Sequence, residues 1–132
     1  MERRSVPKVN AAEGNAVDAH RGQVYLSGRT RIADADAARF RARRAELGLG
    51  PLVIHDNYLI NLASPDRVMR ARSIQAFHGE LVRAVSLGAD FLVAHPGSSL
   101  GGEKTQAISD IAQGLQQAAR GMKLGGLRIL IE

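Results

Sequence analysis

Short apolar runs alternate along this chain with longer stretches in which apolar residues recur every three or four positions. The short runs are typical of buried strands, and the longer stretches are typical of amphipathic helices. From residue 34 onward the pattern predicts three helices and three strands in alternation, an order that indicates parallel strands joined by right-handed crossovers. The six expected elements cover residues 34–47, 52–55, 64–87, 91–95, 104–121 and 127–132.

Local signals mark the ends of the expected helices. Ser64, Pro65 and Asp66 form a strong helix start. A serine oxygen accepts from unpaired amides, proline fits the first helical position, and aspartate suits the positive end of the helix dipole. Gly88 ends that helix, as glycine commonly does. The third helix should bury one apolar face, formed by Ile108, Ile111, Leu115 and Ala118.

The first 32 residues show no clear period, and we interpret them as a poorly ordered or divergent N-terminal segment. Within it, residues 23–27 are predicted to form a short strand, and residues 28–33 a turn. The organised part of the chain therefore covers residues 33–132. Its predicted fold class is α/β, with three to four parallel strands and flanking helices.

Composition limits the class of protein. At 132 residues the chain is too short for a closed eight-stranded β/α barrel, which needs roughly 250. No apolar run approaches the roughly 18 residues that cross a membrane, and the N-terminus lacks the apolar stretch of a secretory signal. We therefore expect no membrane partner and a cytoplasmic location, with which the absence of cysteine is compatible.

Three residues that can bind a metal follow the predicted strands. His55 and His95 close the first two strands, and Glu132 closes the third. Because parallel strands end at the same edge of a sheet, two imidazoles and one carboxylate should converge where α/β proteins place their sites. Two histidines and a carboxylate are a recognised zinc set that leaves a position open for water. A histidine at one strand end is usually structural, so spacing alone supports metal binding about as strongly as it supports chance.

Two other features of the sequence are better explained by structural roles than by ligand binding. The segment at residues 97–105 resembles a phosphate-binding loop, but Glu103 precedes Lys104 and would repel phosphate, so a flexible glycine loop is the better interpretation. His78 lies beside apolar helix positions and is expected at a surface or boundary. His20 is assigned no role.

The motifs IHDNYLINLASPD at residues 54–66, HPGSS at 95–99 and ILIE at 129–132 resemble three consecutive motifs of the endonuclease IV family. That family consists of metal-dependent endonucleases that act at abasic sites in DNA. The first motif is highly specific, the second moderately so, and the third would be weak alone. The resemblance covers roughly residues 33–132.

The resemblance implies an eight-stranded β/α barrel, of which this chain would form part, with up to three zinc ions at its C-terminal face. His55, His95 and Glu132 match metal ligands, and Glu132, which also bridges to a second zinc in the family, is the candidate catalytic residue. Tyr58 matches an aromatic residue on a DNA-contacting loop. The implied partner is double-stranded DNA with abasic sites, and the implied reaction is hydrolysis of the phosphodiester 5′ to the lesion.

The chain also departs from the family. A histidine-containing first strand and a DNA-contacting loop rich in Lys, Asn and Arg are not found in residues 1–32, and the family continues beyond Glu132 with an Asn-Thr-Ala-Gly loop. We therefore expect a truncated product that holds at most one zinc or a partial site. Whether the chain alone is an enzyme stays open, and we expect it to have little or no activity.

Two alternatives to the nuclease remain. The first is a fragment of a sugar isomerase or epimerase of the xylose isomerase type, since fold alone does not separate these chemistries. The second is a non-enzymatic basic module that binds nucleic acid, because the net charge is +5 and its surplus lies mainly in residues 1–50. The module's phosphate contacts would come from Arg29, Arg31, Arg39, Arg41, Arg43 and Arg44.

Overall fold

The computed structural model describes residues 15–18, 23–26 and 31–132, and these contain one five-stranded sheet in the order β1-β2-β3-β4-β5. The strands are β1 (Asn15–Asp18), β2 (Gln23–Leu26), β3 (Val53–His55), β4 (Phe91–Ala94) and β5 (Arg128–Ile131). Strands β2 to β5 are parallel, which confirms the predicted parallel sheet, and β1 pairs antiparallel with β2. Strand β2 was expected from the sequence and β1 was not, and residues 28–30 of the predicted turn at 28–33 lie outside the described residues.

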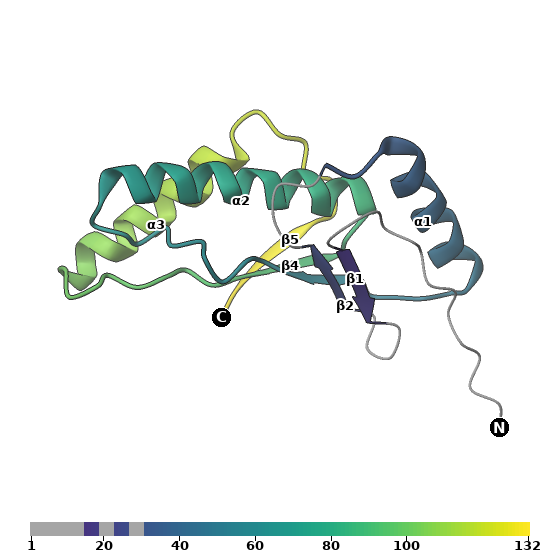
Figure 1. Cartoon of the computed structure of the whole chain (residues 1–132), viewed down its shortest axis with the longest axis horizontal. Coiled ribbons are helices and arrows are strands. Elements are labelled where there is room, and N and C mark those ends of the chain that lie inside the picture. The colour runs from purple at the N-terminus through teal and green to yellow at the C-terminus, as the bar shows by residue number, and fades with distance from the viewer. Residues whose placement is uncertain (1–14, 19–22, 27–30) are drawn as a thin grey trace, which may run out of the picture.

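Three helices lie on one side of the sheet (Figure 1). They are α1 (Asp34–Glu46), α2 (Arg67–Leu87) and α3 (Lys104–Ala119), and α2 packs against both of the others. Among the described residues, none of these helices is long and apolar enough to cross a membrane. Alternating parallel strands and helices in an open sheet are the arrangement expected of part of a β/α barrel.

The core lies between the helices and the sheet. Ile54 of β3 and Leu92 of β4 are fully buried, and Phe77 and Leu81 of α2 pack in the same cluster. Burial along β4 alternates, because successive side chains of a strand point to opposite faces. Helix α2 ends at Gly88, whose φ of 68° is the left-handed conformation that suits glycine, and this brings the chain back toward β4.

Two details of the helices differ from the sequence expectation. Helix α2 is capped by Asp66, not by Ser64, because the Asp66 carboxylate accepts from the amides of Val68 and Met69 while the Ser64 hydroxyl accepts from the Asp66 amide. In α3 the side chain of Ile108 is exposed, so the predicted apolar face is shorter at its start. The face packed on the core is formed by Ile111, Leu115 and Ala118.

Candidate metal centre

The three predicted metal ligands come together at one edge of the sheet. Glu132 Oε2 lies 2.9 Å from Nε2 of His55 and 3.5 Å from Nε2 of His95. The two imidazole rings have their centroids 4.6 Å apart and are tilted by 54°. One ligand atom from each residue lies within 4.8 Å of the others, so a single ion between them could contact all three. Among the described residues, no other such group of histidine and acidic side chains is present.

The sheet register produces this convergence. His55 pairs with Val93 in the adjacent strand, and Ala94 pairs with Ile131. The residues that follow this second pair, His95 and Glu132, therefore emerge at the same level. A bond from the Glu132 amide to the Ala94 carbonyl, at 3.2 Å, continues the ladder to the last residue. Because neighbouring strands lie about 5 Å apart, side chains at successive strand ends reach a common point.

The imidazole and carboxylate of the cluster change each other's acidity. The hydrogen bond to Glu132 is the main cause that raises the pKa of His55, while burial opposes it. The same bond lowers the pKa of Glu132, and the nearby His95 lowers it further. All three side chains are roughly half exposed, so the cluster is open to solvent and to a substrate.

Asp56 is a buried part of this site that the sequence analysis did not single out. Its carboxylate is fully buried, and Oδ1 accepts from the His95 amide at 3.2 Å. Burial is the main cause that raises the pKa of Asp56, and its Oδ2 atom has no hydrogen-bond partner among the described residues. Asp56 thereby ties the ends of β3 and β4 together beneath the two histidines. The available signal was its position directly after His55.

Tyr58 lies on the loop between β3 and α2, which covers residues 56–66 and is called here the first loop. Its side chain is 81% exposed, and Leu59 beside it is also exposed. Tyr58 is not part of the cluster formed by the two histidines and Glu132. An exposed aromatic residue near the edge that holds the ligands can contact a large substrate without contacting the ion.

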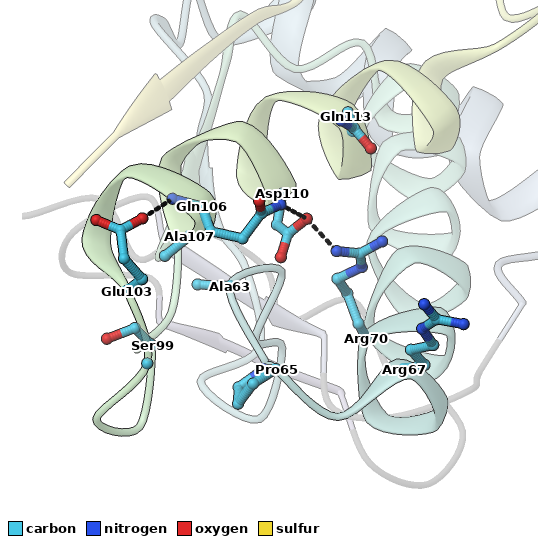
Figure 2. Close-up of a pocket in the computed structure, with 11 residues that line it drawn as sticks. Ala63, Pro65, Arg67, Arg70, Ser99, Glu103, Gln106, Ala107, Asp110 and Gln113 are labelled. Atoms are coloured by element: carbon cyan, nitrogen blue, oxygen red, sulfur yellow. Dashed lines mark hydrogen bonds and ion pairs between the residues drawn. The ribbon is translucent and has the colours of Figure 1, made fainter.

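A separate cleft of about 400 Å³ lies between the starts of α2 and α3 (Figure 2). Arg70 of α2 forms an ion pair with Asp110 of α3 across it, and Gln106 donates to the same carboxylate. Arg67, Glu103 and Ser99 also line it, so its acidic and basic groups balance. None of the three metal-binding candidates lines this cleft, which therefore does not belong to the metal centre.

The structure also bears on the features given structural roles. The Glu103 carboxylate accepts from the Gln106 amide at 2.7 Å, so a negative charge already occupies the start of α3, where a phosphate would bind. His78 forms a 2.7 Å hydrogen bond between its Nδ1 atom and the carbonyl oxygen of Ala118, at the boundary of α2 and α3. Both observations agree with the structural interpretation.

The arginines of α1 are largely engaged within the chain. Arg39 and Arg43 pair with carboxylates of the same helix, and Arg44 contacts Asp90 at 2.5 Å. Arg41 donates to the carbonyl of Ser86 on α2. Arg29 lies outside the described residues. These contacts weaken the case for a basic nucleic-acid-binding face, because ion pairs reduce the positive charge offered to a polyanion.

Comparison with known proteins shows which family the chain resembles. A probable endonuclease 4 of Solibacter usitatus is 50% identical over 91 residues, which are 69% of this chain and 31% of the relative. A probable endonuclease 4 of Chloroflexus aurantiacus is 36% identical over 101 residues, or 76% of this chain and 35% of the relative. The resemblance to endonuclease IV is thus confirmed, and the chain spans about a third of the length of these relatives. The family model of the xylose isomerase-like TIM barrel matches residues 8–132, and the chain therefore belongs to that family.

Proposed function

We propose that this chain carries one metal-binding part of a zinc-dependent endonuclease site for abasic DNA. The reaction would be hydrolysis of the phosphodiester 5′ to the lesion in double-stranded DNA, as the resemblance to endonuclease IV implies. The observation that carries the proposal is the convergence of His55, His95 and Glu132 within 4.8 Å. The relatives named probable endonuclease 4 support the nuclease interpretation. A cytoplasmic location is part of the same proposal.

The donor set fits zinc. Two imidazole nitrogens and one carboxylate oxygen are common zinc ligands, and three protein ligands leave a position open for water or substrate. A bound zinc ion would lower the pKa of a coordinated water and polarise a phosphoryl oxygen. In this chain His55 and His95 would supply the neutral nitrogens, and Glu132 would supply negative charge and the candidate catalytic carboxylate. Tyr58 would contact the DNA from the first loop.

Zinc titration of the chain tests this proposal. Calorimetry should show one zinc ion bound per chain, and Glu132→Gln should weaken binding, because the amide replaces a charged ligand with a neutral one. Glu46→Gln serves as the matched control, since Glu46 is an exposed residue of α1 paired with Arg43. Absence of zinc binding by the wild-type chain, or equal weakening by both variants, would contradict the metal centre.

An abasic-site duplex tests the activity itself. We expect little or no cleavage by the chain alone, because its described residues supply three ligands where the family implies up to three zinc ions. Cleavage that appears with zinc, disappears with chelator and is lost in Glu132→Gln would show that this chain is sufficient for the reaction. The expectation of inactivity would then be wrong, while the assignment of the site would stand.

Sugar isomerisation of the xylose isomerase type is the second candidate. The name of the matched family is the observation that favours it. The relatives described above are nevertheless named endonucleases, and the exposed Tyr58 suits a large substrate better than a small sugar. Metal-dependent turnover of an aldose in place of DNA binding would favour this candidate.

A further inference from the structure

The side chain of Asn61 connects two loops that the sheet alone does not join. Its Nδ2 atom donates to the Ser98 carbonyl at 3.0 Å, and its Oδ1 atom accepts from the Ser98 amide at 3.1 Å. The same Oδ1 atom accepts from the amide of Ala63 at 3.0 Å, which holds the amide plane in place. Asn61 lies in the first loop, and Ser98 lies in the segment after β4 at residues 95–103, called here the second loop.

The contact between Asn61 and Ser98 has the hydrogen-bond pattern of two paired strands. A carboxamide offers one donor and one acceptor side by side, and both meet the backbone of a single residue, as in an exchanged pair of sheet hydrogen bonds. The orientation of the amide is unambiguous, because a flipped Asn61 would place its NH₂ group against the amides of Ser98 and Ala63. The side chain therefore extends the link between neighbouring strands beyond the end of the sheet.

Gly97 shows how closely the two loops approach. Its φ is +99°, and a Cβ atom built there would lie 2.0 Å from Oδ1 and 2.9 Å from Cα of Asn61. Only glycine allows the second loop to pass this close in that conformation. The backbone of Asn61 is itself anchored, because its amide donates to the Ser73 hydroxyl of α2 at 3.0 Å.

We propose that Asn61 is a positioning residue that sets the second loop, and with it His95, relative to the first loop and Tyr58. His95 lies three residues before Ser98, and Tyr58 lies three residues before Asn61. The segment from His95 to Ser98 is tied at its start by Asp56 and at its end by Asn61. The inference rests on the proposed function in that it assigns His95 to the metal and Tyr58 to DNA.

A positioning role predicts that replacing Asn61 weakens metal binding by more than the accompanying loss of stability explains. Partners that orient a ligand from outside the coordination sphere typically change metal affinity about 10- to 100-fold. We therefore expect Asn61→Ala to weaken zinc binding about tenfold. We also expect a changed visible absorption spectrum of the cobalt-loaded chain, because a displaced His95 alters the coordination geometry.

Two controls separate positioning from folding. Asn57→Ala removes a bond of the same type, from the Leu59 amide at 2.9 Å, but that bond lies wholly within the first loop. Phe77→Leu lowers stability through the buried core and removes no hydrogen bond from either loop. Both controls should keep wild-type zinc affinity and the wild-type cobalt spectrum. Wild-type zinc affinity in Asn61→Ala, or an equal loss in Phe77→Leu, would overturn the proposal.

Amide exchange of the metal-free chain distinguishes failure of this inference from failure of the proposed function. If the wild-type chain binds no zinc, the proposed metal centre fails, and exchange at Ser98 then decides the role of Asn61. Faster exchange at Ser98 in Asn61→Ala than in Asn57→Ala supports the connection, and equal exchange overturns it. If Asn61→Ala does not fold, Asn61→Asp keeps the acceptor for Ala63 but places a second oxygen against the Ser98 carbonyl, and the same readouts apply.

Discussion

The Nε2 atom of His55 lies 2.9 Å from the Oε2 atom of Glu132, although 77 positions separate the two residues in the chain. The contact raises the pKa of the imidazole and lowers the pKa of the carboxyl group. A metal ion bound by both residues would take the place of the shared proton. The pKa values of His55 and Glu132 therefore show whether these two ligands are in contact even when the chain is studied without metal.

The first prediction concerns pH. The raised pKa of His55 means that its contribution to stability is complete below the ordinary histidine value of about 6.5 and is lost as the pH rises through the folded value. The lowered pKa of Glu132 means that its contribution is present above the ordinary glutamate value of about 4.3 and is lost as the pH falls through the folded value. The pair should thus stabilise the metal-free chain most between these two values, by a small amount because both groups are exposed.

Histidine titration by NMR measures this effect. In the metal-free chain, Glu132→Gln should move the pKa of His55 downward, because it removes the main cause of the rise. An unchanged pKa of His55 would show that the contact with Glu132 is not formed in solution.

The second prediction concerns the approach of the two loops at Gly97. Gly97→Ala should lower the free energy of unfolding by more than about 2 kcal/mol, because the new Cβ atom would overlap Asn61 and the φ is positive. Gly121→Ala should cost only about 1–2 kcal/mol, because its φ of +73° is strained but nothing lies within 4 Å of the added atom. Urea denaturation compares the two, and equal losses would contradict the close contact.

The third prediction concerns the core beneath the sheet. Phe77→Ala should lower the free energy of unfolding by about 3–5 kcal/mol, because the ring is fully buried between α2 and the strands. Val68→Ala on the same helix should change it by less than about 0.5 kcal/mol, since that side chain is 61% exposed. Thermal or urea unfolding monitored by circular dichroism distinguishes them. A similar cost for both would mean that α2 does not pack as described.

The fourth prediction concerns Tyr58. Tyr58→Ala should weaken binding of zinc-loaded chain to an abasic-site duplex and leave the melting temperature unchanged, because the ring is 81% exposed. Ile108→Ala removes another exposed apolar side chain, on α3, and should leave DNA binding intact. Fluorescence anisotropy with a labelled duplex measures both. Equal affinities of wild-type chain and Tyr58→Ala would remove Tyr58 from the proposed DNA contact.

Local patterns were sufficient for most of the fold. The apolar runs around Ile54 and Leu92 predicted buried strands, and the structure confirms both. The end of α2 was predicted because glycine readily takes the left-handed conformation that stops a helix, and Gly88 takes it in the structure. The predicted cap of α2 was wrong. Ser64 and Asp66 are both good capping residues, and only the path of the chain decides which of them accepts hydrogen bonds from the helix amides.

The candidate site also contains some residues that the sequence predicted and others that it did not. Histidine or glutamate at the ends of three successive strands predicted the cluster, because parallel strands end at one edge whatever their side chains. Asp56 and Asn61 carried no comparable signal. A carboxylate or carboxamide after a strand is usually a loop residue, and its partners, the amides of His95 and Ser98, lie 39 and 37 positions away.

The sequence by itself determined the order of the elements, the parallel direction of their strands and the residues that can bind a metal, because these depend on periodicity and on chemistry carried by single residues. Tertiary structure alone decided that β5 lies next to β4, that Glu132 contacts both histidines, and that Asn61 joins the two loops. Each of these depends on groups that lie far apart in the chain, and no sequence pattern shows the distance between them. The sheet register brings Glu132 to the two histidines, and the close approach of the two loops brings Asn61 to Ser98.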